Sequence, residues 1–237
     1  MAVLFSSACQ DEYGKYQGGM AGDQTGKEVR TTNAYQHKKG WRIFRHPNTK
    51  TAYWIGTNAR VMADNNNFGY DQLERLSGYN KAKAAGWEPK RVNTLCELDC
   101  SSFVRTAVAC ALERDIPNFN TASEPNVLLS LGFVEITGTP LSQLQLGDIV
   151  CTPVQGHTEI VSSGASATVS APSVQYYPRY TGSSKSIAVA LKSLGIDGSF
   201  SHRKLIAKAN SIGGYIGTAS QNTKMLTLLK QGRLIKE

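Results

Sequence analysis

One stretch of the sequence, residues 99–112, constrains the fold more than any other. It reads DCSSFVRTAVACAL, and its apolar side chains recur at helical spacing: Phe103, Val104, Ala107, Val108, Ala111 and Leu112. This pattern predicts a helix buried in the core, with Asp99 as its cap and Cys100 in its first turn. The positive end of the helix dipole stabilises a thiolate there, and the unpaired N–H groups can hold an oxyanion. Cys100 is therefore a candidate nucleophile, and the alternative is a buried structural thiol.

A nucleophilic cysteine needs a base, and His157 is the candidate among the four histidines. Residues 147–151 (GDIVC) predict a turn followed by a strand, and residues 157–161 (HTEIV) alternate as a second strand. His157 begins this second strand, where an imidazole can face a cleft. Taken alone, such a histidine is more often structural, but a cysteine on a helix followed by a histidine on a strand favours a thiol hydrolase. The other histidines lie in polar or C-terminal segments: His37, His46 and His202.

Composition bounds the class of protein. The 237 residues are 41% hydrophobic and 19% charged, which excludes a collagen, a coiled coil and wholesale disorder. No apolar run approaches the roughly 20 residues of a membrane helix. The first residues (MAVLF) contain no basic residue, and the acids Asp11 and Glu12 follow them, so the sequence predicts synthesis in the cytoplasm without a signal peptide.

Charge is unevenly distributed along the chain. From Thr181 onward the sequence carries nine of its 26 basic residues but only two of its 18 acidic residues, whereas the preceding part is nearly neutral. A basic segment attached to a neutral body predicts docking on a polyanion, such as nucleic acid, anionic lipid or an anionic cell wall. The alternative is a charged surface that only keeps the segment in solution.

The basic segment has its own predicted structure. Residues 171–184 (APSVQYYPRYTGSS) contain two prolines, a glycine and a serine cluster, which are typical of a linker. After it, apolar spacing predicts three short helices, over 186–194, over 201–209 and in the segment that follows Thr218 or Ser220. Three helices in this length make a small but plausible domain.

Three segments together carry a family resemblance: DCSSF at 99–103, GDIV at 147–150 and GHTEIV at 156–161. Their combination resembles the papain-like bacterial cell-wall cysteine hydrolases of the NlpC and CHAP kind, and it looks most like the catalytic domain of phage and prophage endolysins. Residues 18–29 (GGMAGDQTGKEV) and 66–72 (NNFGYDQ) are similar to blocks found near the start of such lysins.

The resemblance covers roughly residues 8–165, and the tail is similar to the C-terminal wall-binding module of such lysins through SFSHR at 199–203 and GTASQNT at 217–223. It implies an α+β fold in which a papain-like core packs the nucleophile helix on an antiparallel sheet, followed by a small all-helical domain. The implied organisation is a catalytic domain over 1–170, a linker over 171–184 and a cell-wall-binding domain over 185–237.

The resemblance also implies roles. Cys100 would be the nucleophile, and His157 the general base and then the general acid. A third polar group usually orients the imidazole. In related enzymes it often comes from the strand after the histidine, here residues 165–171, whose polar members are Ser166, Thr168 and Ser170. Glu159 is the alternative, because residues two apart share one face of a strand, although a surface glutamate would look the same.

Substrate contacts are expected from Asp23 and Gln24, in a glycine-rich loop, and from Ser101 beside the nucleophile. The loop pair has a second interpretation, since aspartate is common in turns anyway. No metal and no cofactor are expected. A zinc site made by Cys96, Cys100 and His157 is disfavoured, because C-x3-C lacks the usual ligand spacing.

The predicted function is therefore an endolysin that hydrolyses amide bonds in peptidoglycan. Either the N-acetylmuramoyl-L-alanine amide or a peptide bond of the stem or cross-bridge could be cut. The expected partners are peptidoglycan and anionic wall polymers, reached after release through a holin pore. Nucleic acid is not expected, because the tail offers only Phe200 and Tyr215 for base stacking. The alternatives are a non-enzymatic polyanion-binding protein and a cytosolic thiol amidase or transglutaminase-like enzyme.

Overall fold

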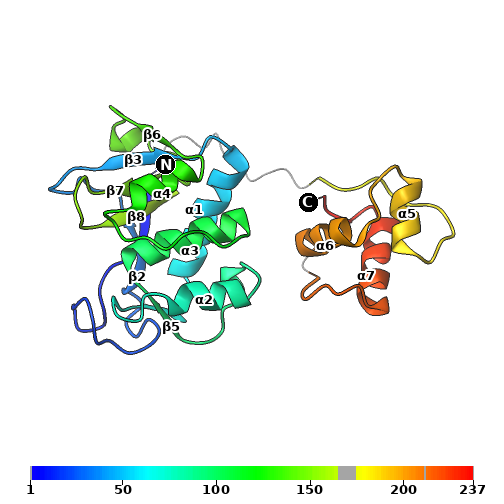
Figure 1. Ribbon diagram of the computed structural model, residues 1–237, viewed down its shortest axis with the longest axis horizontal. Helices are drawn as coiled ribbons and strands as arrows, with labels where there is room; N and C mark the ends of the chain where they lie inside the picture. The colour runs from blue at the N-terminus through cyan, green and yellow to red at the C-terminus, as the bar shows by residue number, and fades with distance from the viewer. Residues whose placement is uncertain (1, 165–174, 211, 237) are drawn as a thin grey trace. The chain divides into compact units, whose positions relative to one another are not determined.

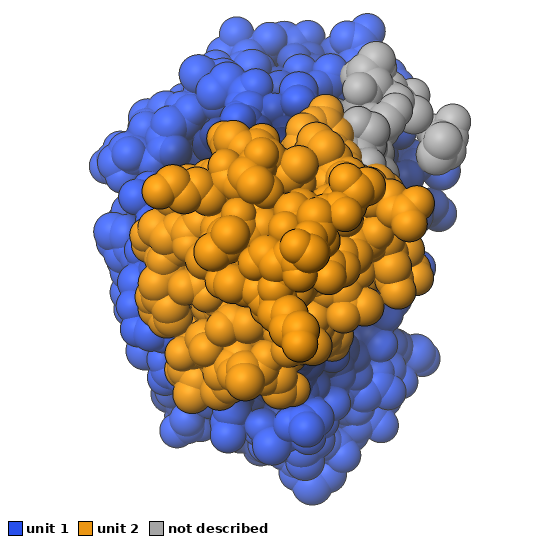
Figure 2. Space-filling view, turned by 90° about the vertical axis from the view of Figure 1, so that its right-hand side faces the viewer, with its two compact units in different colours: residues 1–172 blue, residues 173–237 orange. Residues whose placement is uncertain are grey.

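The computed structural model describes residues 2–164, 175–210 and 212–236. The chain divides into two compact units, Met1–Pro172 and Ser173–Glu237 (Figure 2). Each unit has a hydrophobic core of its own. Within the described ranges, no helix combines the length and the apolar character that crossing a membrane requires.

The first unit is built on a six-stranded sheet (Figure 1). Its strands are β1 (Leu4–Ala8), β2 (Val29–Asn33), β3 (Arg42–Arg45), β6 (Val134–Ile136), β7 (Ile149–Cys151) and β8 (Thr158–Ser163). They run in the order β2-β1-β8-β7-β3-β6, and every neighbouring pair is antiparallel. Two short strands, β4 (Phe68–Tyr70) and β5 (Cys96–Leu98), pair in parallel outside this sheet.

Seven α-helices lie in the described parts of the chain. The first unit contributes α1 (Thr49–Ala63), α2 (Ser77–Ala84), α3 (Cys100–Leu112) and α4 (Glu124–Ser130), with two 3₁₀ turns, η1 (Pro89–Arg91) and η2 (Leu141–Gln143). The second unit contributes α5 (Ile187–Ser193), α6 (Phe200–Ala209) and α7 (Ala219–Lys230). The expected α+β class with an antiparallel sheet is therefore confirmed, while the papain-like identity of the core stays a prediction.

The helix predicted over 99–112 is α3, and its first turn is held by a capping box. The Asp99 carboxylate accepts a hydrogen bond from the Ser102 backbone N–H at 2.6 Å, and the Ser102 hydroxyl accepts one from the Asp99 N–H at 2.8 Å. A cap of this kind stabilises a helix by about 1 kcal/mol. Every residue from Cys100 to Cys110 is buried. The start of α3 is thus fixed both by its cap and by packing.

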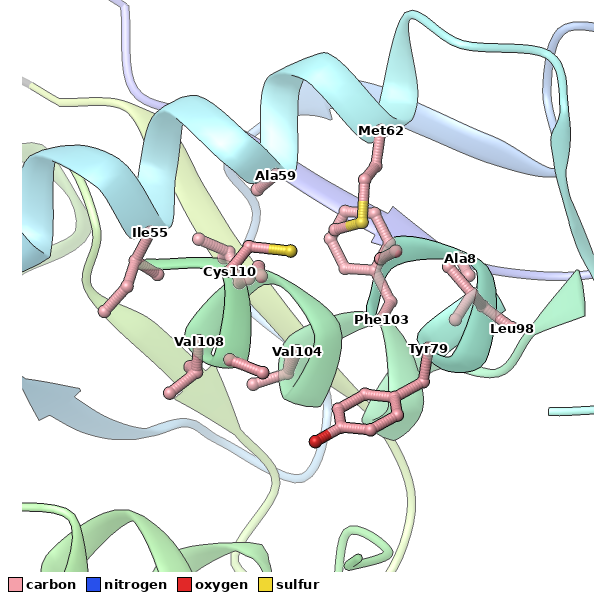
Figure 3. Packing of buried hydrophobic residues seen from close by; sticks show 14 of the residues in the cluster. Ala8, Ile55, Ala59, Met62, Tyr79, Leu98, Phe103, Val104, Val108 and Cys110 are labelled. Atoms are coloured by element: carbon pink, nitrogen blue, oxygen red, sulfur yellow. The ribbon is translucent and has the colours of Figure 1, made fainter. Parts of the chain in front are cut away.

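The core of the first unit forms where α1 and α3 meet. Met62 on α1 points toward Phe103 on α3, and Ile55 on α1 points toward Val108 on the same helix (Figure 3). All four side chains are fully buried. Burying side chains of this size stabilises the fold by roughly 1.5–3 kcal/mol each, so this layer holds α3 against the rest of the unit.

A glycine lets α1 approach the turn that precedes β7. Gly147 has φ of +87°, and a Cβ atom placed there would lie 2.0 Å from the Ala52 carbonyl oxygen of α1. Any larger residue would force α1 and the turn apart. This close approach explains why the GDIV segment begins with glycine, two residues before β7.

The second unit is a three-helix arrangement with an isolated bridge between Tyr176 and Ile235. Ser199 caps α6, two residues before the serine expected from the sequence, and Thr218 caps α7 in a capping box with Gln221. The core side chains are mostly aliphatic and aromatic: Tyr177, Tyr180, Ile187, Ala190, Leu191, Ile206, Ala207, Ile212, Tyr215, Met225, Leu226, Leu229 and Leu234.

Separate cores predict separate unfolding. Phe103→Ala should lower the midpoint of one thermal transition, and Leu229→Ala should lower the midpoint of another, because each removes roughly 2–5 kcal/mol of packing from one core only. Differential scanning calorimetry of the full chain and of both variants measures this. A single transition that both substitutions shift equally would contradict two independently folding units.

Candidate active site

Cys100 is the first residue of α3 and directly follows β5 and the capping residue Asp99. It is buried, with 8% of its surface exposed. Its side chain is close enough to that of His157, which immediately precedes β8, for each to shift the pKa of the other. The structure therefore brings together the two residues that the sequence singled out, one from the helix start and one from the sheet.

The imidazole of His157 is held from its other side by Glu159. The ring Nε2 lies 2.8 Å from Glu159 Oε1, and the Tyr35 hydroxyl donates a hydrogen bond to the same oxygen at 3.0 Å. The Glu159 side chain is only 4% exposed. Both residues lie on the same face of one strand, as expected for positions two apart. The resulting series is thiol, imidazole and carboxylate.

The turn before β8 fixes the backbone position of His157. The Thr152 backbone N–H donates to the His157 carbonyl at 2.9 Å, and the His157 N–H donates to the Thr152 hydroxyl at 3.1 Å. Thr152 follows the end of β7, so these bonds close the β7–β8 connection. The backbone of His157 is thereby ordered independently of its side-chain contacts.

Burial and charge act in opposite directions on this pair. Burial raises the pKa of the Cys100 thiol, while the hydrogen bond and the charge of His157 lower it. Burial lowers the pKa of His157, but hydrogen bonds with Cys100, Cys9 and Glu159 outweigh it and bring that pKa above its ordinary value. The protonated imidazole helps to form a thiolate, but burial is the larger influence and leaves the pKa of Cys100 above its ordinary value; the two groups titrate as a unit.

Of the candidates for the group that orients the imidazole, the structure describes only Glu159. Residues 165–171, with Ser166, Thr168 and Ser170, lie outside the described residues. Glu159 contacts the imidazole directly, although its role in catalysis stays a prediction. Its second oxygen, Oε2, is buried and has no hydrogen-bond partner within the described parts of the chain.

Ser101 and Asp99 are engaged by an arginine. Arg75 donates from Nε to Asp99 Oδ2 at 2.6 Å and from Nη2 to the Ser101 hydroxyl at 2.8 Å, while Ser101 donates to Asp99 Oδ1 at 3.0 Å. Arg75 also donates to the Phe119 carbonyl at 2.6 Å. This network orders the first turn of α3 around Cys100. The substrate contact expected of Ser101 stays a prediction.

Asp23 and Gln24 shape their own loop. Asp23 Oδ1 accepts from the backbone of Thr25 at 2.9 Å, and Oδ2 accepts from the backbone of Glu28 at 3.0 Å. The Gln24 side chain donates to the carbonyls of residues 21 and 22 at 2.9 and 3.1 Å. These bonds give both residues a structural role, and their expected substrate contacts stay predictions.

Sequence reasoning missed Cys9. It follows β1, and its thiol donates to the Ser7 carbonyl at 3.7 Å while lying close to the His157 ring. The ligand atoms of Cys9, His157 and Glu159 all lie within 4.8 Å of one another. Cys96, which the sequence offered as a zinc ligand, instead donates its thiol hydrogen to the Asn67 carbonyl at 3.3 Å. No local pattern marks Cys9, because its place depends on the pairing of β1 with β8.

A second missed residue is Glu124, the first residue of α4. It is fully buried, and Thr158 on β8 donates to its Oε1 at 2.7 Å. Burial raises the pKa of this carboxyl to about 8. Its other oxygen has no hydrogen-bond partner among the described residues, which fits a carboxyl that is protonated at neutral pH.

The buried carboxyl predicts a pH-dependent stability. Its folded-state pKa of about 8 exceeds the ordinary 4.5, so its contribution to stability is complete below about pH 4.5 and is lost as the pH rises toward 8. Glu124→Gln should therefore gain roughly 3–5 kcal/mol relative to the unmodified chain between these limits. Urea unfolding across this pH range measures the gain.

The exposed Glu74 supplies the control, and Glu74→Gln should follow the unmodified chain at every pH. A Glu124→Gln curve that stays parallel to that of the unmodified chain would show that this carboxyl ionises normally in the folded state.

Comparison with known proteins adds one match. A family model described as an endolysin-like domain matches residues 5–167, which span the sheet from β1 to β8 and include both Cys100 and His157. Neither the curated proteins nor the solved structures contain a match. Because the matched segment covers more than half of the sequence and carries the whole thiol–imidazole–carboxylate arrangement, the chain belongs to the endolysin-like domain family.

Proposed function

We propose that the chain is a cysteine peptidoglycan hydrolase of the endolysin type, with Cys100 as nucleophile and His157 as general base and acid. Family membership indicates a cell-wall hydrolase with a lysis-related function and a peptidoglycan substrate. The observation that carries the thiol mechanism is the contact of Cys100 with an imidazole that Glu159 holds from its other side. This is the arrangement of a nucleophile, a base and an orienting group.

The first half of the reaction acylates the enzyme. The Cys100 sulfur, having given its proton to His157, attacks the carbonyl carbon of an amide, and the carbonyl oxygen takes up negative charge. Backbone N–H groups in the first turn of α3 that the Asp99 cap does not use would stabilise that oxygen. His157 then donates its proton to the departing nitrogen, the C–N bond breaks, and a thioester remains on Cys100.

The second half releases the product. His157, neutral again, takes a proton from a water molecule, and the hydroxide attacks the thioester. The C–S bond breaks, the carboxylic product leaves, and the imidazolium faces the Cys100 thiolate once more. Glu159 supports both halves, because it keeps Nε2 engaged and leaves the other ring nitrogen for the sulfur.

The second unit is proposed to bind the wall. Its exposed basic side chains are spread over all three helices and the C-terminal segment: Lys185, Lys192, Lys204, Lys224, Arg233 and Lys236. Wall polymers of Gram-positive bacteria are anionic, so a unit with this charge binds them electrostatically. The predicted release of the enzyme through a holin pore remains part of the proposal.

A groove in this unit offers a specific contact. It has a volume of about 610 Å³, and its lining consists of Ala188, Val189, Lys192, Gly195, Ile196, Asp197, Gly198 and Ser199. Hydrogen bonds from Ser199 lower the pKa of Asp197, which keeps a carboxylate at the same groove. A lining that contains one basic, one acidic and two large apolar side chains suits a ligand that carries both charged groups and apolar carbon.

The nucleophile is tested by Cys100→Ala. The variant should lose wall lysis, by roughly a thousandfold or more, because no other group supplies the covalent step. It should still bind purified walls. Turbidity loss of wall suspensions measures lysis, and mass spectrometry of the digest identifies the bond from the new amine and carboxyl. The matched control is Cys110→Ala, which removes a thiol from the same helix and should keep lysis.

Retained lysis in Cys100→Ala would remove this residue from the nucleophile role. Loss of lysis in both variants, with both folded, would show that the assay responds to disturbance of α3 rather than to the chemistry of one sulfur.

Wall binding by the groove is tested by charge reversal. Lys192→Glu should weaken binding to purified walls by about fivefold or more, since it places a like charge beside an anionic ligand. Lys224→Glu changes the net charge equally but lies on α7, outside the groove lining, and should weaken binding less. Co-sedimentation with walls at two salt concentrations measures both. Equal weakening would mean that net charge alone holds the unit to the wall.

A further inference from the structure

Three side chains that can bind a metal lie close together at the candidate site, and the proposed nucleophile Cys100 is not one of them. The thiol of Cys9, a ring nitrogen of His157 and a carboxylate oxygen of Glu159 all lie within 4.8 Å of one another. Two neighbouring strands position them, because Cys9 follows β1, His157 immediately precedes β8 and Glu159 is the second residue of β8. The antiparallel pairing of these strands, with Phe5 opposite Val161 and Ser6 opposite Ile160, holds the three groups on one rigid support.

One of these ligands has an unused oxygen. Glu159 Oε2 is buried and has no hydrogen-bond partner in the described ranges, although the side chain is only 4% exposed. Leaving such an acceptor unpaired in the interior costs roughly 1–3 kcal/mol, more when it is charged. A bound cation would satisfy it. Cys9, by contrast, is half-buried, so the ligand set is reachable from solvent.

We propose that Cys9, His157 and Glu159 form a zinc site that holds the hydrolase inactive. Sulfur, imidazole nitrogen and carboxylate oxygen are the three ligand types that Zn²⁺ takes in proteins, and a soft thiolate favours it over Mg²⁺ or Ca²⁺. The inhibition rests on the proposed function, because the metal occupies the imidazole that Cys100 needs. The binding itself does not depend on that function.

The distances suit this ion after small side-chain movements. Zinc–ligand bonds of about 2.0–2.3 Å in a tetrahedron separate neighbouring ligand atoms by roughly 3.3–3.8 Å. His157 Nε2 and Glu159 Oε1 are now 2.8 Å apart, and a metal between them would replace their hydrogen bond. The Cys9 sulfur lies within 4.8 Å of the other two ligand atoms, so it needs only to turn toward the same point.

Binding releases protons and transfers no electrons. The Cys9 thiol gives its proton to solvent and becomes a thiolate ligand, and His157 gives up its proton because it ligates as neutral imidazole. Three protein ligands leave a fourth position, which a water molecule takes. With the metal on its ring, His157 can no longer accept a proton from Cys100.

Direct metal binding is the first test. The full-length chain, stripped with a chelator, should bind one Zn²⁺ per chain in competition with a chromophoric chelator. Cys9→Ala and Glu159→Gln should each bind roughly tenfold more weakly or worse. Cys110→Ala is the matched control for losing a thiol, and Cys100→Ala should stay within a few-fold of the unmodified chain. Cobalt titration adds a spectroscopic signature, because a thiolate ligand gives a charge-transfer band that Cys9→Ala should lack.

The second test measures activity as the rate of wall lysis with added Zn²⁺ divided by the rate without it, for each protein separately. This ratio should be about one tenth or less for the unmodified chain, and chelator should restore lysis. It should stay near one for Cys9→Ala, or for Cys9→Ser if circular dichroism shows that Cys9→Ala is unfolded. Unchanged binding in both Cys9→Ala and Glu159→Gln would overturn the site. Chelator that abolishes lysis, with zinc restoring it, would overturn the inhibitory role.

The two proposals fail separately. A chain that lyses walls but binds no zinc would refute the metal site and leave the hydrolase standing. A chain that binds zinc through Cys9 but lyses no walls under any condition would refute the hydrolase and leave the metal site standing.

Discussion

The burial of α3 on all of its faces is the constraint on which the candidate site depends. A helix that packs against α1, α2 and the sheet cannot rotate or slide without opening the core, so its first residue has a fixed position. That residue is Cys100. The capping box and the Arg75 network then remove the fraying that helix ends normally show. The position of the Cys100 sulfur is therefore fixed by packing along the whole helix.

The second half of the site depends on β8, an interior strand of the sheet that pairs with β1 on one side and β7 on the other. Interior strands seldom carry buried polar side chains, yet Thr158 and Glu159 are both buried. Each has partners from other elements: Glu124 for Thr158, and Tyr35 with His157 for Glu159. Burying these polar groups lowers the stability of the fold, and a strand with a purely structural role would carry apolar residues there instead.

Strong local periodicity made part of the molecule predictable. The helix over 99–112, the turn at Gly147 and the strand after His157 all have clear patterns, and the structure contains α3, β7 and β8 there. The helices of the second unit were also predictable, although the cap of α6 moved from Ser201 to Ser199. The contact between Cys100 and His157 was expected from the family resemblance, and their catalytic roles stay predictions.

Long-range pairing limited the rest. Cys9 reaches His157 only because the first strand of the chain pairs with the last strand of the sheet, a pairing that no local pattern encodes. Glu124 lies on a helix of seven residues, too short for a clear apolar stripe, so its burial could not be inferred. The hydrogen bonds that Asp23 accepts from its loop backbone leave little trace in a sequence, and its expected substrate contact stays a prediction.

Burial also sorts the sulfur atoms of the chain by reactivity. Four of the five cysteines are buried, and burial raises the pKa of Cys96 to about 12, so that this thiol stays protonated in the cell. Oxidants and electrophiles attack the thiolate form and need access to it. Cys9 is half-buried, and the buried Cys100 beside the same imidazole is the proposed nucleophile. Oxidation of the stored, folded protein should therefore begin at a thiol beside the imidazole of His157, where it would also impair the proposed catalysis.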